Sequence, residues 1–172
     1  MSLNDTVIGL PSETASGVVS DDLLVALRFE GLMIPANASV VSAEIQFRSF
    51  APDSNPGSPA LQLAASKSGH VTSFSSFVVS QLSLVGSVVW YPEVWLDANV
   101  AGGAQRAVGL ESIFQQLVSL QSWNASSGVV TIVIKRKEPV PLNDPTNPPP
   151  FRLASFGPQT APILTISYQG WS

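Results

Sequence analysis

The stretch VVSAEIQFRSF, residues 40–50, alternates apolar and polar side chains with a period of two residues. Its apolar positions hold Val41, Ala43, Ile45 and Phe47, and the polar positions between and after them hold Ser42, Glu44, Gln46 and Arg48. Successive side chains of an extended chain point to opposite sides. The stretch therefore predicts a β-strand with one face in a core and the other face in water.

Further extended segments lie before and after this strand in the sequence. They span residues 25–30, 61–66, 87–95, 128–137 and 162–168. Residues 128–137 are apolar on both faces, as a central strand would be. Pro92 cannot donate a ladder hydrogen bond, so its segment is expected at an edge or a bulge. These short strands predict an all-β fold, an antiparallel β-sandwich.

One segment follows a helical period instead. In LESIFQQLVSLQSW, residues 110–123, apolar side chains recur at spacings of three and four, namely Ile113, Phe114, Leu117, Val118 and Leu120. Such a stripe is typical of an amphipathic helix. Glu111 in the first turn interacts favourably with the helix dipole. We expect one short helix around residues 110–122 that closes one end of the sandwich.

The chain of 172 residues is long enough for one domain, which at this size buries about 70% of the surface of its unfolded chain. We expect a single β-sandwich domain over residues 1–172, with residues 1–5 as a linker or expression scar. The stretch EPVPLNDPTNPPPF, residues 138–151, lies between two expected strands. Its prolines favour an extended path without ladder hydrogen bonds, which predicts an ordered loop insertion on the surface.

Charge and hydropathy exclude several classes of function. The net charge is −4, and the basic residues are scattered apart from the run Lys135-Arg136-Lys137. Nucleic-acid binding needs a clustered cationic face. No apolar run approaches the roughly 20 residues that span a bilayer. We therefore expect no nucleic-acid partner and no membrane insertion.

An extracellular or cell-surface location is favoured by the polar composition. Only 12% of the residues are charged, so the surface must be dominated by uncharged polar groups, which are common outside cells. The beginning MSLNDTVIGL lacks the features of a signal peptide, so with an extracellular location we expect the chain to be a mature fragment of a secreted protein. Asn37 and Asn124 begin Asn-x-Ser sequons within turn-forming stretches, as glycosylated surface loops would.

The sequence contains few features that indicate a catalytic site. His70 is the only histidine and lies among Ser and Gly, which is typical of a surface loop. The chain lacks a Gly-x-Ser-x-Gly elbow, a phosphate-binding glycine loop and a His-Glu-x-x-His helix. Twelve acidic residues could supply the two carboxylates of a glycoside hydrolase, but no pair is singled out. We expect a protein that is not an enzyme.

The order of the motifs resembles a known family. Residues 12–49 contain an acidic residue before Ser-Gly-x-Val, the strand LRF, the turn GLMIP and the strand quoted first. VVWYPEVW, the helix before Trp123 and the ending FRLASF…APILTISY follow in order. Over about residues 12–168 this order is similar to jelly-roll modules of microbial and algal surface proteins, with the DNRLRE-type carbohydrate-binding modules as the nearest relatives.

The resemblance implies a non-catalytic jelly roll that binds polysaccharide or glycoprotein glycan and requires no cofactor. Arg152 matches a recurrent position, where we expect a structural ion pair. Calcium is the usual structural ion of secreted jelly rolls and takes six to eight oxygen ligands. Glu13, Asp21 and Asp22 lie in turns and are the candidate calcium ligands, although the family's acidic cluster is thinned to Glu13 here.

A sugar-binding surface needs an aromatic ring beside hydrogen-bonding groups. Trp90, Tyr91 and Trp95 surround Pro92, so one ring can face solvent; alternatively, both tryptophans pack beneath the sheet edge. A second candidate is the polar strand face with Glu44, Gln46 and Arg48, beside which Arg28 and Glu30 are expected. The alternative there is a face that is simply wetted. Trp123, after the helix, is expected to fill the core.

We therefore expect a recognition module for polysaccharide or glycan. The alternative is a structural or adhesive building block of a cell-surface or matrix protein, which touches neighbouring domains and binds no sugar. A hydrolase with an unrecognised carboxylate pair is the third reading. An exposed ring beside polar groups would favour glycan, a flat apolar patch would favour assembly, and carboxylates facing across a cleft would favour hydrolysis.

Overall fold

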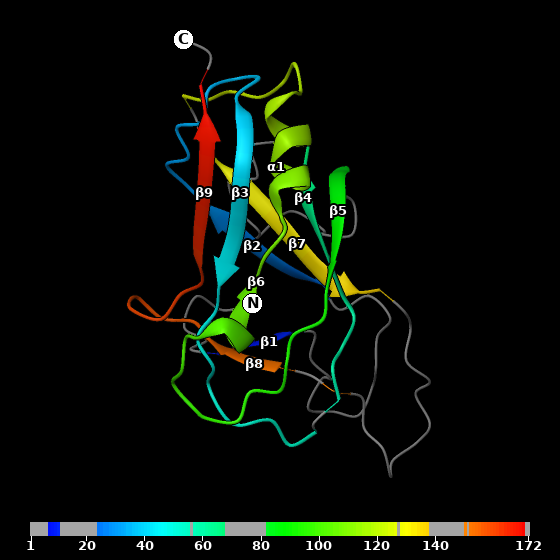
Figure 1. The fold of residues 1–172 in the computed structure, drawn as a ribbon, viewed down its shortest axis with the longest axis vertical. Coiled ribbons are helices and arrows are strands. Elements are labelled where there is room, and N and C mark those ends of the chain that lie inside the picture. Colours follow the sequence, from blue (N-terminus) through cyan, green and yellow to red (C-terminus); the bar gives the residue numbers. More distant parts are fainter. Residues whose placement is uncertain are drawn as a thin grey trace.

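The structure is a computed structural model that describes residues 7–10, 24–55, 57–67, 82–126, 128–137, 150 and 152–170. These residues form an all-β fold with one α-helix, as predicted (Figure 1). The strands are β1 (Val7–Leu10), β2 (Val25–Phe29), β3 (Ser39–Gln46), β4 (Leu61–Ser66), β5 (Leu84–Trp90), β6 (Arg106–Ala107), β7 (Val130–Arg136), β8 (Arg152–Ser155) and β9 (Ile163–Gln169). The helices are α1 (Glu111–Val118) and the short 3-10 helix η2 (Gly103–Gln105).

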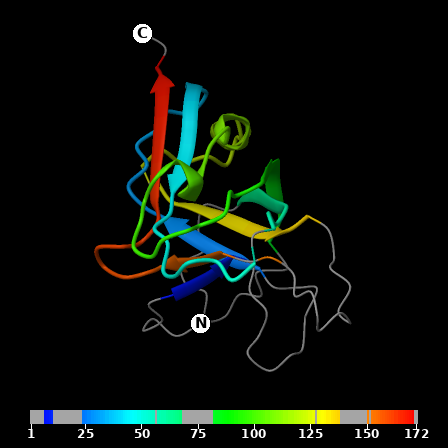
Figure 2. The same cartoon turned by 60° about the horizontal axis from the view of Figure 1, so that its bottom comes forward.

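The strand pairs of the described residues are all antiparallel. One sheet has the order β2-β7-β4-β5, a second has the order β6-β3-β9, and β1 pairs with β8. In Figures 1 and 2 the strands β2 and β7 run across β3 and β9, so the two larger sheets face each other at an angle. β7 is a central strand, as its apolar sequence predicted.

The two smaller sheets are joined through β3. Residues Ser39–Gln46 pair with β9 and end with Gln46 opposite Ile163. Beyond this point the Ser155 N–H donates to the Arg48 carbonyl at 2.8 Å, and the Phe50 N–H donates to the Leu153 carbonyl at 2.8 Å. β8 and β9 therefore lie end to end along the same edge of the β3 segment, with residues 156–162 between them.

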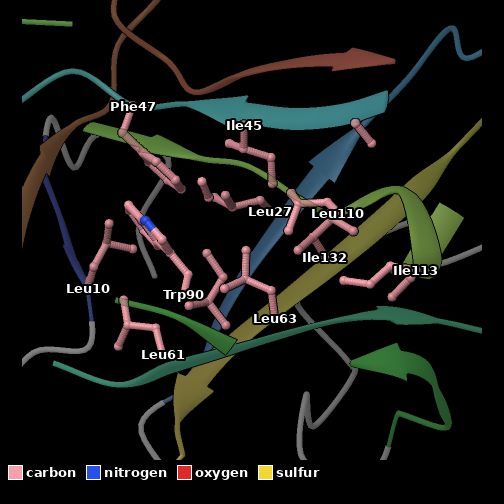
Figure 3. Packing of buried hydrophobic residues seen from close by; sticks show 14 of the residues in the cluster. Leu10, Leu27, Ile45, Phe47, Leu61, Leu63, Trp90, Leu110, Ile113 and Ile132 are labelled. Atoms are coloured by element: carbon pink, nitrogen blue, oxygen red, sulfur yellow. The ribbon is translucent and has the colours of Figure 1, made fainter. Parts of the chain in front are cut away.

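The core lies between the two layers and contains side chains from both. Phe47, which directly follows β3, stacks on Trp90 from β5, with 5.4 Å between the ring centroids (Figure 3). Leu27, Leu63 and Ile132 of the four-stranded sheet belong to the same buried cluster. Burying a side chain of this size stabilises the fold by about 1.5–3 kcal/mol, so this face-to-face contact holds the sandwich together.

The predicted alternation of β3 is correct at Ala43, Ile45 and Phe47, which are all buried. It is wrong at Val41, which is 55% exposed. The pairing of β3 with β9 shifts between Val40 and Ser42, so one extra residue is present on β3. Such a bulge turns the following side chains to the other face, and Val40 packs against the core in place of Val41.

Helix α1 is shorter than the predicted range of 110–122. It ends at Val118, and the hydroxyl of the following Ser119 donates to the Gln115 carbonyl at 2.7 Å. Its buried face is the predicted one, formed by Ile113, Phe114, Leu117 and Val118. Figure 1 places α1 at one end of the sandwich, between β3 and β5.

Gly86 of β5 allows α1 to approach the sheet closely. Its φ is +66°, a conformation that favours glycine. A Cβ atom at this position would lie 2.8 Å from the Cα of Ile113, which is closer than atoms can pack. From α1, the Gln115 side chain accepts a hydrogen bond from the Val40 N–H and donates one to the Ala38 carbonyl. The helix thereby fixes the beginning of β3.

None of the described helices is long and apolar enough to cross a membrane. The expected loop insertion over residues 138–151 lies outside the described residues except for Pro150, and residues 1–5 lie outside them as well.

Candidate functional site

Both candidate tryptophans are core residues. Trp90 is only 8% exposed because its ring stacks on Phe47, and Trp95 is fully buried. The indole N–H of Trp95 donates to the Ala104 carbonyl at 3.0 Å, so its polar edge is also satisfied. Neither ring offers a face to a ligand, and the alternative interpretation, in which both pack beneath the sheet edge, describes this structure. Trp123, which was expected to fill the core, is half-buried and packs against it, and it donates to the Ile34 carbonyl at 2.9 Å.

Arg152 forms the expected structural ion pair, and its partner is Asp53. The Arg152 Nε lies 3.1 Å from the Asp53 Oδ2, and both side chains are buried. The guanidinium also donates to three backbone carbonyls, those of Gly57, Pro92 and Glu93. The Asp53 carboxylate accepts a hydrogen bond from the Trp95 N–H. The pair therefore fastens β8 to the segments that precede β4 and follow β5.

Burial shifts the pKa values of Asp53 and Arg152 in opposite directions. It raises the pKa of the Asp53 carboxyl, while the hydrogen bond from Trp95 and the charge of Arg152 act in the opposite direction. Burial lowers the pKa of Arg152, and the charge of Asp53 opposes this shift. Each charge is tolerated in the interior because the other is present. Neither group reaches solvent, so the pair holds structure and is not placed to meet a ligand.

Tyr91 is the one candidate ring that faces solvent, with 58% of its surface exposed. It directly follows Trp90 and therefore points away from the core. Trp90 and Leu61 are opposite each other in the register of β4 and β5, and Leu61 is opposite Arg136 of β7. One residue further along, the Lys137 N–H donates to the Ala60 carbonyl at 2.9 Å. Tyr91, Ala60 and Lys137 thus form one row across three neighbouring strand ends.

The next outward-facing row contains Gln62 and Lys135, which are opposite each other in β4 and β7. The Gln62 side-chain amide donates to the Ser87 hydroxyl at 2.6 Å. Neither Lys135 nor Lys137 forms an ion pair with a residue that the structure describes. We call Tyr91, Gln62, Lys135 and Lys137 the Tyr91 face. Two strand spacings separate Tyr91 from Lys137, about 10 Å, so this face can contact more than one sugar ring.

The second candidate surface, the β3 polar face, consists of Glu44, Gln46 and Arg48. The Gln46 amide donates to the carbonyls of Phe47 and Gly102, and its oxygen accepts from Arg106 at 2.9 Å. The side-chain amide of Gln46 therefore forms its hydrogen bonds within the protein. Glu44 lies 3.8 Å from the Arg106 guanidinium, and Arg48 donates to the Asn99 carbonyl at 2.8 Å. The polar groups of this face therefore form hydrogen bonds and ion pairs with other groups of the protein.

Arg28 and Glu30 do not lie beside the β3 polar face, contrary to expectation. Arg28 is in β2, which belongs to the four-stranded sheet, and its guanidinium lies 2.7 Å from the carboxylate of Glu30. The expectation failed because strands that follow each other in sequence fall into different layers of the sandwich. The residue that does lie beside Glu44 and Gln46 is Arg106 of β6.

The Tyr91 face and the β3 polar face are on opposite sides of the molecule. Phe47 and Trp90 point toward each other across the core. Gln46 and Arg48 flank Phe47, and Tyr91 follows Trp90, so alternation directs them outward through opposite faces. The structure therefore does not bring the six candidate ligand-binding residues together. Gln62, Lys135 and Lys137 were missed, although the basic run 135–137 was a visible signal.

The candidate calcium ligands Glu13, Asp21 and Asp22 lie outside the described residues, as does His70, and calcium stays an expectation. Within the described part of the chain, no group of three or more His, Asp or Glu side chains could hold a metal ion. The sequon residues Asn37 and Asn124 are exposed. They share one end of the molecule, where the Asn37 N–H donates to the Val118 carbonyl at 3.0 Å.

Comparisons with protein-family models, with curated proteins and with solved structures find no match. Function is therefore inferred from the residues and their geometry.

Proposed function

We propose that the protein is a non-catalytic, extracellular recognition module that binds polysaccharide or glycan through the Tyr91 face. The observation that supports this proposal is the exposed ring of Tyr91, which the packing of the core does not require. The ring of a sugar has an apolar C–H face and a rim of hydroxyl groups. It matches an aromatic surface with a few polar groups beside it, as ligand sites in general do.

The charges of the Tyr91 face favour an acidic sugar. Lys135 lies opposite Gln62 and Lys137 lies in the neighbouring row, on a protein whose net charge is −4. Neither lysine forms an ion pair with a carboxylate that the structure describes. Two such cations on an otherwise acidic protein attract carboxylate or sulfate groups, and this attraction is screened by salt. The β3 polar face is less suited to this role because its groups already bond to one another.

The strand pairing supports the jelly-roll form of the sandwich. β1 pairs with β8, β2 with β7, β3 with β6, and β4 with β5. This nested order results when one long antiparallel ribbon is rolled into two sheets, as in a jelly roll of eight strands. In this description β9 is the continuation of β8 beyond residues 156–162.

A second candidate function is a structural or adhesive building block. It is favoured by exposed apolar side chains along the β3–β9 side of the molecule, which are Met33, Val41, Ile163 and Tyr168. Contact through this side would join domains without a sugar. It uses a different surface from the Tyr91 face, so the two functions can be tested separately.

The test is binding to a panel of neutral and acidic polysaccharides. Tyr91→Ala should weaken binding about tenfold or more, which corresponds to about 1.4 kcal/mol, whereas Tyr91→Phe should retain most of it. The matched control is Phe50→Ala, which removes another exposed aromatic ring that lies outside the Tyr91 face. Absence of binding across the panel, or equal binding by Tyr91→Ala, would contradict the proposal.

The same panel tests the lysines. The double substitution Lys135→Gln and Lys137→Gln should weaken binding to acidic polysaccharides and flatten its dependence on salt. Lys67→Gln is the control, because Lys67 follows the other end of β4. If all variants bind neutral and acidic chains equally, the assignment of acidic sugars is wrong.

A further inference from the structure

β9 has a free edge. It pairs with β3 on one side, and on its other side none of its backbone groups bonds to a described residue. The strand is seven residues long, and Ile163 is 63% exposed. Leu164 and Ile166 point toward the core but are only partly buried. A row of unpaired N–H and C=O groups of this kind is a template for another strand.

The other described sheet edges carry protective features that β9 lacks. β1 has four residues and β6 has two, which leaves little edge to pair. β2 carries Arg28, and β5 is bulged where Gly86 adopts a positive φ. Short strands, charges and bulges are the means by which proteins prevent edge pairing. β9 reads ILTISYQ, with no charge, no proline and no extra residue opposite β3.

The sequence of β9 is complementary to itself. In an antiparallel pair centred on Ile166, Thr165 lies opposite Ser167, Leu164 opposite Tyr168, and Ile163 opposite Gln169. Each pair joins two outward-facing or two inward-facing side chains, because positions equally distant from the centre have the same parity. Hydroxyl pairs and aromatic–aliphatic pairs are favourable across antiparallel strands. No position brings two like charges together.

Exposed apolar residues at the two ends of β9 would also face each other in a pair of strands related by a two-fold axis at Ile166. The Tyr168 hydroxyl donates to the Met33 carbonyl at 3.0 Å, which places Met33, 79% exposed, at the C-terminal end of β9. Ile163 is exposed at the other end. A two-fold axis at Ile166 brings the Met33 end of one copy against the Ile163 end of the other, twice. This self-matching arrangement is what a closed symmetric dimer needs.

We propose that β9 pairs with β9 of a second copy of this chain, antiparallel about a two-fold axis at Ile166, and extends β6-β3-β9 into a six-stranded sheet. A seven-residue strand is about 23 Å long, and a contact limited to one such strand is small compared with most stable interfaces. The dimer is therefore reversible and forms with increasing concentration. The proposal does not depend on glycan binding.

The test is sedimentation of the full chain from about 1 μM to about 1 mM. The wild type should rise from the mass of one chain toward twice that mass. The double substitution Thr165→Lys and Ser167→Lys places lysine opposite lysine on both sides of the axis, so this variant should stay at the mass of one chain. Ser112→Lys with Gln116→Lys is the matched control, since it adds the same charge on the exposed face of α1 and should dimerise as the wild type does.

A charge exchange separates loss of pairing from loss of folding. Thr165→Glu with Ser167→Glu should also be monomeric alone, but an equimolar mixture of the lysine and glutamate variants should form dimers. A wild type that remains monomeric over the whole range, a lysine variant that dimerises as the wild type does, or a mixture that remains monomeric would each overturn the proposal.

Discussion

Arg152 and Asp53 are buried charges that hold irregular chain in place. The Arg152 guanidinium bonds to the carbonyls of Gly57, Pro92 and Glu93 as well as to Asp53. These carbonyls belong to segments outside the strands, which have no ladder to satisfy them. One side chain thus supplies the hydrogen bonds that a sheet would otherwise provide, and the position of Tyr91, next to Pro92, depends on it.

Arg152→Met should destabilise the protein by about 3–5 kcal/mol, because it leaves the Asp53 carboxylate buried without a counter-charge. Urea denaturation monitored by tryptophan fluorescence measures this loss. Arg28→Met is the control, since Arg28 pairs with Glu30 near the surface, where such a pair is worth about 0–1 kcal/mol. Equal effects of the two substitutions would show that the buried pair has no special role.

Only one of the two residues of the ion pair could be predicted from the sequence. The position of Arg152 suggested a structural role, but Asp53 was not identified, because its partner is distant in the sequence and no local pattern joins them. Trp90 and Trp95 show the same limit. Alternation tells which side chains share a face, but Pro92 interrupts the pattern between them, and only the contacts with Phe47 and Ala104 show that both rings are buried.

At the scale of elements, the contact between α1 and β5 depends on one glycine. The amphipathic stripe predicted the buried face of α1 correctly, because it arises from the sequence of the helix alone. The distance of the helix from the sheet depends on Gly86, whose bulge is set by the pairing of β4 with β5. The outward turn of Val41 has a similar cause, since its bulge arises in the pairing of β3 with β9. Bulges were not visible in the sequence.

Gly86→Ala should destabilise the protein by about 1–3 kcal/mol, through its positive φ and the overlap of its Cβ with Ile113. The midpoint of thermal unfolding measures this effect. Gly103→Ala is the control, because a Cβ there meets no atom within 4 Å, and it should change the midpoint little. An unchanged midpoint for Gly86→Ala would mean that the helix can move away at no cost.

At the scale of the whole molecule, the Tyr91 face and the β9 edge belong to different sheets. A β9-paired dimer therefore carries two Tyr91 faces, neither of which is covered by the pairing. The sequence predicted the class of fold because alternation is local. It did not predict which strands are neighbours, and so it placed Arg28 beside Gln46 when they are in different layers.

On a surface dense in polysaccharide, the wild type should dissociate more slowly than the Thr165→Lys, Ser167→Lys variant, because two linked sites bind with a raised effective concentration. Surface plasmon resonance at high and low ligand density measures this difference. In solution, a short oligosaccharide should bind both proteins equally. A wild type that dissociates at the same rate as the variant at every density would show that the two sites are not used together.

The end-to-end arrangement of β8 and β9 has a consequence for engineering and for evolution. Residues 156–162 leave the line of the strand, and β9 rejoins the same edge with Ile163 opposite Gln46. The Thr160 and Ala161 N–H groups both donate to the Gly157 carbonyl and close the turn. This detour can change its length without displacing either half of the strand. Foreign peptides spliced there would be displayed from a scaffold that need not rearrange to accept them.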